Sequence, residues 1–362
     1  MPNEPTIILT SAAAQPTSSP AGEVARTQAA RRRVLSLIQP TSVPTIGNYF
    51  GALRNWASMA EDYDCVYGVA DLHALTIRPA PADLRRQTAE MLAILLALNL
   101  RRGNNIVFVQ SHVPQHCQLS WILNSYTQFG EAARMTQFKE KSAAHADNVN
   151  VGLFSYPTLM AADILIYQAH YVPIGADQKQ HLELTRNIAE RFNGLYGDVF
   201  VVPEPYIGKI GSRVMSLQEP TAKMSKSDPN PKASVWLLDP PEQIVKKIKS
   251  AVTDSEACVR RGDGKEGVNN LMEIYSCSTG KSFNAIEREF EGQGYGAFKQ
   301  AVAEALVEEL RPFQEEYKRL LADKAYLEQA AREGAQAAAH IAGRTTEKVM
   351  KKVGLWQVDG KR

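Results

Sequence analysis

Three short apolar runs alternate with amphipathic segments in the first third of the chain. Residues 34–38, 65–70 and 106–110 are nearly continuously hydrophobic, whereas residues 83–98 carry apolar side chains at three- and four-residue spacing. Strands that are buried on both faces are typically apolar throughout, and helices of this length connect such strands in a parallel sheet. The pattern predicts an α/β fold built on a doubly wound parallel sheet of the Rossmann type.

A second region begins near residue 229, where the strand pattern stops. Between residues 298 and 320, apolar side chains recur every three or four positions, while glutamates and lysines fill the opposite face. Such a stripe is typical of a helix that packs on a core, although Pro312 is expected to kink this one. Helices are predicted over residues 241–252, 271–276, 298–321 and 324–352.

These patterns divide the chain into three parts. Residues 1–33 are rich in Ala, Ser, Thr, Pro and Gln, a composition that predicts a flexible N-terminal extension. Residues 34–235 form the predicted sheet domain, including a mobile loop near its end, and residues 236–362 form a C-terminal α-helical domain. With 362 residues and 44% apolar content, the chain is long enough to bury both cores.

Composition excludes few classes of function. A net charge of +2 does not by itself indicate a nucleic-acid partner. Four widely spaced cysteines favour reduced thiols and a cytoplasmic protein, and no run approaches the roughly 20 apolar residues of a membrane span. His112 and His116 are separated by Pro114 and have no further ligands nearby, so we predict no metal site built from protein ligands.

Candidate chemistry begins with residues 39–48, Gln-Pro-Thr-Ser-Val-Pro-Thr-Ile-Gly-Asn. A strand, a Pro-rich turn and a helix entry follow one another in a nucleotide-binding first crossover, where backbone N–H groups at the helix start face an anion. Gly47 has no Cβ and would let a flat base lie against the backbone.

Ligands of a doubly wound sheet bind beyond the carboxyl ends of its strands, where the connection order reverses. The residues that follow the three apolar runs are therefore expected at the rim of the pocket. They are Gln39, Asp71, His73, Gln110 and His112.

Residues 223–227, Lys-Met-Ser-Lys-Ser, place two lysines three positions apart in a short loop flanked by prolines. Each lysine is a compact, mobile point charge that suits a polyphosphate. The alternative is an ordinary solvated loop, and the motif alone leaves both interpretations open.

Asp163 lies in an otherwise apolar, helix-like segment, residues 157–167. A lone carboxylate in such surroundings is costly unless it accepts a hydrogen bond. The donor is either a ligand such as an indole N–H, or a neighbouring arginine or helix terminus.

In their order and separation, the two motifs resemble the HIGH-type and KMSKS-type signatures of the class I aminoacyl-tRNA synthetases. Residues 135–142, 156–165 and 172–181 are similar to blocks of the bacterial and organellar tryptophanyl-tRNA synthetases, and the resemblance extends from about residue 34 to residue 355. It implies ATP-dependent activation of L-tryptophan and its transfer to tRNA(Trp), with Mg²⁺ bound together with ATP. It also implies a homodimer, with the helical domain helping to bind the anticodon end.

The same resemblance assigns roles to residues. Lys141, Lys223 and Lys226 would act in catalysis by contacting the phosphates. The other residues implied for ATP are Gln39, Thr45, Gly47, Asn48 and, at the ribose, Asp177. For tryptophan, Asp163 would accept the indole N–H, Tyr156 and Gln178 would lie near the ammonium group, and Met160 and His73 would surround the ring.

The chain departs from the family pattern at Leu37 and Ser42, where glycine is usual, and at Pro44. These changes, together with the extension, motivate the hypothesis of an auxiliary second synthetase with an altered substrate range or a partner-linked role. The alternatives are a tyrosyl-type synthetase and a non-catalytic paralogue that regulates by binding RNA or protein.

The N-terminal extension ends in Arg31, Arg32 and Arg33. It is a contact arm for RNA or protein, an inert tail or an organellar transit peptide. Glu4 and Glu23 weaken the last interpretation, since transit peptides are poor in acidic residues.

Overall fold

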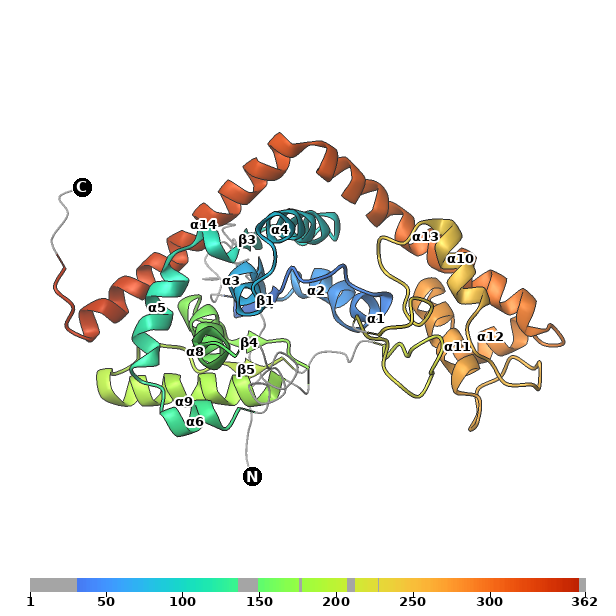
Figure 1. Cartoon of the computed structure of the whole chain (residues 1–362), viewed down its shortest axis with the longest axis horizontal. Helices are drawn as coiled ribbons and strands as arrows, with labels where there is room; N and C mark the ends of the chain where they lie inside the picture. Colours follow the sequence, from blue (N-terminus) through green and yellow to red (C-terminus); the bar gives the residue numbers. More distant parts are fainter. Residues whose placement is uncertain (1–30, 136–148, 176–177, 207–211, 227, 358–362) are drawn as a thin grey trace, which may run out of the picture. The chain divides into compact units, whose positions relative to one another are not determined.

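The computed structural model describes residues 31–135, 149–175, 178–206, 212–226 and 228–357. Five parallel strands form a sheet in the order β3-β2-β1-β4-β5 (Figure 1). The first strand, β1, is the central one. The next two strands, β2 and β3, lie on one side of it, and β4 and β5 lie on the other. The strands are β1 (Arg33–Ile38), β2 (Asp64–Val69), β3 (Ile106–Val109), β4 (Tyr171–Val172) and β5 (Glu204–Pro205).

This order confirms the predicted doubly wound parallel sheet. The connections reverse direction between β1 and β4, so the crevice at the carboxyl ends of these two strands is the expected position of a ligand.

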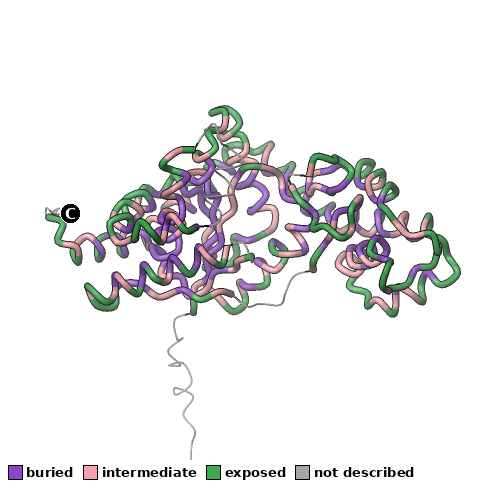
Figure 2. The backbone as a smooth tube through the Cα atoms, turned by 60° about the horizontal axis from the view of Figure 1, so that its bottom comes forward, coloured by how far each residue is buried: buried purple, intermediate pink, exposed green. Residues whose placement is uncertain are grey.

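Both faces of the sheet are buried, which explains the continuous apolar runs. Val34 and Tyr67 belong to one core, whereas their neighbours Leu35 and Val66 belong to the other, because successive side chains of a strand point to opposite faces. Figure 2 shows the buried positions concentrated along the strands and the inner faces of the helices. The principal covering helices are α4 (Pro81–Ala97), α5 (Gln115–Asn124), α8 (Val151–Ile166) and α9 (Lys179–Tyr196).

Short helical turns carry the chain between these elements, and several of them lie at the carboxyl ends of the strands. They are α1 (Ile46–Asn48), η1 (Tyr49–Leu53), α2 (Arg54–Met59), α3 (Asp71–Ala74), η2 (Leu75–Ile77), η3 (Gln110–His112) and α6 (Phe129–Ala133).

The predicted helical region follows residue 240. Its helices are α10 (Pro241–Lys249), α11 (Glu266–Thr279), α12 (Phe283–Glu289), α13 (Tyr295–Ala322) and α14 (Lys324–Lys352). The stripe on α13 is buried as expected, and α13 packs on α10, α11 and α4. The helix continues through Pro312 as one element.

The last helix, α14, packs on the sheet domain as well as on α13. It lies against β3, α5 and α8, and Ala338, Ala342 and Val349 belong to the core on that face of the sheet (Figure 1). A Cβ on Gly334 would be 1.9 Å from the carbonyl oxygen of Val107, so the backbone of α14 approaches β3 directly. The division at residue 236 stays a proposal, since α14 is part of the cover of the sheet.

Within the described part of the chain, we find no helix with the length and apolar character needed to cross a membrane.

Candidate active site

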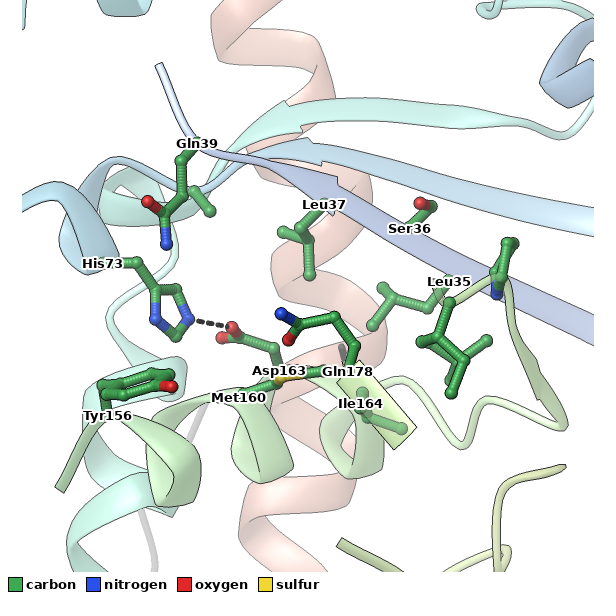
Figure 3. Close-up of a pocket in the computed structure, with 14 residues that line it drawn as sticks. Leu35, Ser36, Leu37, Gln39, His73, Tyr156, Met160, Asp163, Ile164 and Gln178 are labelled. Carbon is green, nitrogen blue, oxygen red and sulfur yellow. Dashed lines mark hydrogen bonds and ion pairs between the residues drawn. The ribbon is translucent and has the colours of Figure 1, made fainter. Parts of the chain in front are cut away.

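A pocket lies at the carboxyl ends of β1 and β4 and is lined by α8 and by Gln178, which directly precedes α9 (Figure 3). Gln39, which follows β1, lines this pocket, as the switch-point argument predicts. The five residues that the resemblance assigned to tryptophan line it as well: Asp163, Tyr156, Gln178, Met160 and His73. The structure thus brings together residues that are up to 139 positions apart in the sequence, from Gln39 to Gln178, while their ligand stays a prediction.

Asp163, on α8, is the charged centre of the pocket and is only 1% exposed. Its Oδ1 atom accepts hydrogen bonds from Nε2 of Gln110 at 2.7 Å and from Nδ1 of His116 at 2.6 Å. Its Oδ2 atom lies 2.7 Å from Nε2 of His73. Among the described residues, the donors are therefore two histidines and an amide, and the alternative of a neighbouring arginine or a helix terminus is wrong.

These contacts decide the charge of Asp163. Burial alone would raise the pKa of its carboxyl group, but the hydrogen bonds from His116 and His73 outweigh burial and lower the pKa to about 2. The group is therefore a carboxylate at neutral pH. Two carboxylate oxygens offer about four acceptor positions, so three protein donors leave acceptor capacity on Oδ2 for a ligand N–H.

His116 contacts the buried carboxylate of Asp163, although the sequence pattern did not indicate this. Its Nδ1 atom must carry a proton to donate to ionised Asp163, and its Nε2 atom, 2.8 Å from the hydroxyl oxygen of Tyr167, then accepts from that hydroxyl group. The side chain of Phe108 stacks on the imidazole ring with centroids 5.6 Å apart. The four-residue spacing from His112 raised only the question of a zinc site, which was not predicted, and it did not indicate a contact with Asp163.

A second missed histidine joins two of the predicted binding residues. Nε2 of His181 lies 2.8 Å from the hydroxyl oxygen of Tyr156, and Nδ1 lies 2.9 Å from Oε1 of Gln178. His181 is 1% exposed and sits on the first turn of α9, three residues after Gln178. It therefore holds both side chains in fixed orientations at the pocket wall.

The Lys-Met-Ser-Lys motif lies beside the start of α1. A Cβ on Gly47 would be 3.4 Å from Cβ of Met224, and Nζ of Lys226 is 3.4 Å from the carbonyl oxygen of Ser42. Burial lowers the pKa of the Lys226 ammonium group to about 8, whereas Lys223 is exposed. The structure thus places the two motifs next to each other, although 175 positions of sequence separate Asn48 from Lys223.

The start of α1 differs from the expectation in two respects. Two of its backbone N–H groups are already bonded, since Ile46 donates to the carbonyl oxygen of Val235 at 2.9 Å and Asn48 donates to that of Thr45 at 3.0 Å. Thr45 and Asn48 form a capping box, in which each side chain bonds to the backbone of the other. The face of Gly47 that was expected to receive a base is covered by Met224.

Lys141 and Asp177 lie outside the described residues. Among the residues that are described, no group of three or more His, Cys, Asp or Glu side chains could hold a metal ion.

Comparison with known proteins identifies the class that this fold and pocket define. A family model described as tRNA synthetases class I (W and Y) matches residues 27–311. The chain belongs to this family, as the motifs indicated. Among curated relatives, it is 52% identical over 325 residues to the tryptophan–tRNA ligase of Clostridium tetani, a match that covers 90% of this chain and 96% of the relative. The tryptophan–tRNA ligase of Clostridium acetobutylicum is 50% identical over 326 residues, with 90% and 97% covered.

Solved structures agree with this placement. Tryptophanyl-tRNA synthetase from Campylobacter jejuni, complexed with ADP and tryptophan, is similar with a TM-score of 0.80 at 31% identity, covering 89% of this chain and 100% of that one. The enzyme from Mycoplasma pneumoniae gives a TM-score of 0.79 at 32% identity, with 90% and 98% covered. Tyrosyl-tRNA synthetase from Aeropyrum pernix, at 19% identity and a TM-score of 0.60 with 84% of this chain and 90% of that one covered, shares the fold alone.

Proposed function

We propose that this chain is a tryptophan–tRNA ligase that activates L-tryptophan with ATP and transfers it to tRNA(Trp). The observation that carries the proposal is the buried Asp163 carboxylate, ionised and with acceptor capacity left, in a pocket at the switch point of a class I synthetase fold. The tryptophan–tRNA ligases at 50% and 52% identity support the choice of amino acid.

The pocket has the chemistry that an indole ring requires. Met160, Ile164 and Val172 supply apolar surface, and Asp163 supplies one acceptor for the ring N–H. A site that depends on such a hydrogen bond rejects amino acids that lack the donor, because the buried acceptor is then left unpaired. Tyr156 and Gln178, held by His181, are the polar groups that we assign to the ammonium end.

Activation joins the tryptophan carboxylate to the α-phosphorus of ATP and breaks the bond to pyrophosphate. The protein forms no covalent bond in this step, so catalysis consists of positioning and charge stabilisation. We assign Lys223 and Lys226 to the phosphates and Gln39 to the nucleotide side of the pocket. Thr45, Gly47 and Asn48 build the helix start beside them.

The roles of Lys141 at the phosphates and Asp177 at the ribose rest on the resemblance alone. Mg²⁺ would accompany ATP by binding its phosphate oxygens, which are its usual ligands in such sites. A homodimer, a tRNA site on the helical region and a cytoplasmic location are further parts of the proposal.

Tryptophan-dependent exchange of labelled pyrophosphate into ATP tests the activity directly. We expect exchange with tryptophan and little with tyrosine. Preferential exchange with tyrosine would favour the tyrosyl alternative, and no exchange by a folded protein with either amino acid would favour the non-catalytic paralogue.

The auxiliary role suggested by Leu37, Ser42 and Pro44 gains no support from the comparisons, whose curated relatives carry the ordinary ligase name. Arg33 is the first residue of β1, so the extension ends before the predicted residue 33. Deleting residues 1–30 and repeating the tRNA charging assay tests whether the extension contributes to the reaction. An unchanged rate would leave it no role in charging.

A further inference from the structure

A glycine interrupts a row of large side chains beneath the pocket. The strand register places Leu37 of β1 beside Gly68 of β2, and Gly68 beside Phe108 of β3. Residues in register on parallel strands point to the same face of the sheet. A Cβ on Gly68 would lie 2.5 Å from Cδ2 of Leu37 and 2.7 Å from Cε1 of Phe108. Both distances are shorter than real contacts, so the two neighbours share the space that a side chain at position 68 would fill.

The row reaches the pocket from both ends. Leu37 lines the pocket, and Figure 3 shows its side chain extending from β1 toward the site of Asp163 and Gln178. At the other end, Phe108 stacks on His116, which donates to Asp163. The space left by the missing Cβ of Gly68 therefore determines where the side chains of Leu37 and Phe108 lie. Leu37 is a wall of the pocket, and Phe108 stacks on His116, which bonds to Asp163.

We propose that Leu37 is a specificity-determining residue of the amino-acid pocket and that Gly68 determines where its side chain lies. The branched end of Leu37 rests over the missing Cβ, which keeps it low against the sheet and leaves room above it for a large flat ring. The same methyl groups form a wall that excludes substituents on the ring edge facing β1. This inference rests on the proposed use of tryptophan.

The first experiment measures pyrophosphate exchange with tryptophan and with 4-, 5-, 6- and 7-methyltryptophan. Leu37→Ala should raise kcat/KM for at least one methylated analogue, relative to tryptophan, by about tenfold, since one methyl group is typically worth this much in an apolar pocket. Ile38→Ala is the matched control: it removes a similar volume from the next residue of β1, which packs in the core on the opposite face. Unchanged ratios for all four analogues in Leu37→Ala would overturn the assignment.

The second experiment is a double-mutant cycle of Gly68→Ala and Leu37→Ala. Gly68→Ala should raise KM for tryptophan about tenfold and leave KM for ATP unchanged, because the displaced methyl group of Leu37 moves toward the pocket. Adding Leu37→Ala should restore KM by at least about threefold. No recovery would mean that the displaced group is Phe108, and the Leu37–Gly68 pairing would be wrong.

Failure of this inference can be told apart from failure of the proposed function. Exchange with tyrosine but not tryptophan by the unaltered chain contradicts the function. Thermal unfolding without ligand still tests the contact between Leu37 and Gly68, using the unaltered chain, the two single variants and the double variant. Gly68→Ala should lower Tm, and adding Leu37→Ala should recover part of that loss. Additive changes in Tm would show that the two positions do not interact.

Discussion

His116 places its Nδ1 atom 2.6 Å from Oδ1 of Asp163, and both side chains are almost completely buried. The carboxylate at the base of the pocket is therefore held by protein donors before any ligand enters. Because those donors set its charge, they also set the pH range over which it can accept a ligand N–H.

The first prediction concerns this pH range. Asp163 has its pKa lowered to about 2, so it stays ionised through the mildly acidic range, and its contribution to stability is lost only as pH falls from the unfolded value near 3.8 toward 2. His116→Phe removes one donor while burial persists, which raises the pKa. KM for tryptophan in this variant should therefore increase as pH falls from 7 to 5, whereas the unaltered chain shows no such increase from this group.

The exposed neighbour His112 provides the control, since His112→Phe removes an imidazole ring four residues away that does not bond to Asp163. Parallel pH profiles of KM for His116→Phe and the unaltered chain would contradict the proposed control of charge.

A second prediction separates binding of the two substrates. Asp163→Asn keeps the shape of the side chain, and its remaining oxygen can still accept from Gln110 and His116, but the N–H₂ group then takes the place of Oδ2 and faces Nε2 of His73 and the ligand. KM for tryptophan should rise by about 100-fold, with a much smaller change for ATP. The free energy of unfolding should fall by about 1 to 3 kcal/mol, because one buried donor loses its acceptor. An equal rise in both KM values, measured by pyrophosphate exchange on folded protein, would refute the assignment of Asp163 to tryptophan.

The third prediction addresses the link made by His181. His181→Phe breaks the hydrogen bonds to Tyr156 and Gln178 together, so KM for tryptophan should rise about tenfold with a smaller effect on kcat. Tyr156→Phe should produce part of this effect. If His181 acts through Tyr156, the double variant should be less impaired than the product of the two single effects; a full product would assign the histidine another role.

Sequence reasoning found the parallel sheet from three of its five strands, and it found part of the pocket, for an identifiable physical reason. Strands such as β1 are buried on both faces, which makes them continuous apolar runs, and the switch-point rule then places Gln39, His73 and Gln110 at one edge. Asp163 stood out because a carboxylate is rare in an apolar segment. The family followed from ordered motifs and was confirmed by comparison.

The partners of Asp163 could not be found in the same way. His116 lies 47 positions from Asp163 and reaches it only because α5 packs on α8, a tertiary contact without a local signal. The packing of α14 on the sheet was missed for a similar reason. Its small residues are compatible with any solvent-exposed helix. The close approach to β3 depends on Gly334, which faces the carbonyl group of Val107.

The fourth prediction compares the two lysines of the loop. Lys226 has its pKa lowered to about 8 by burial, so its charged form destabilises the fold at neutral pH, and this penalty disappears as pH rises through 8 toward the unfolded value. Lys226→Met should therefore raise the free energy of unfolding at pH 7 by about 1 to 3 kcal/mol while pyrophosphate exchange falls sharply. Lys223→Met, at an exposed position, should reduce exchange without changing stability. Equal stability changes in the two variants would show that burial of Lys226 is not the cause.

The last prediction tests the contact between α14 and the sheet with two glycines of one helix. Gly334→Ala places a Cβ 1.9 Å from the carbonyl oxygen of Val107, and because that atom belongs to the backbone of β3, the helix must shift. A Cβ on Gly343 meets no atom within 4 Å, so Gly343→Ala gains helix propensity, up to about 1 kcal/mol, without a clash. Thermal unfolding should show a lower Tm for Gly334→Ala and an equal or higher Tm for Gly343→Ala. Since Gln110 directly follows β3 and bonds to Asp163, Gly334→Ala should also raise KM for tryptophan, although the substitution lies on a helix outside the pocket. A normal Tm in Gly334→Ala would mean that α14 does not approach β3 this closely.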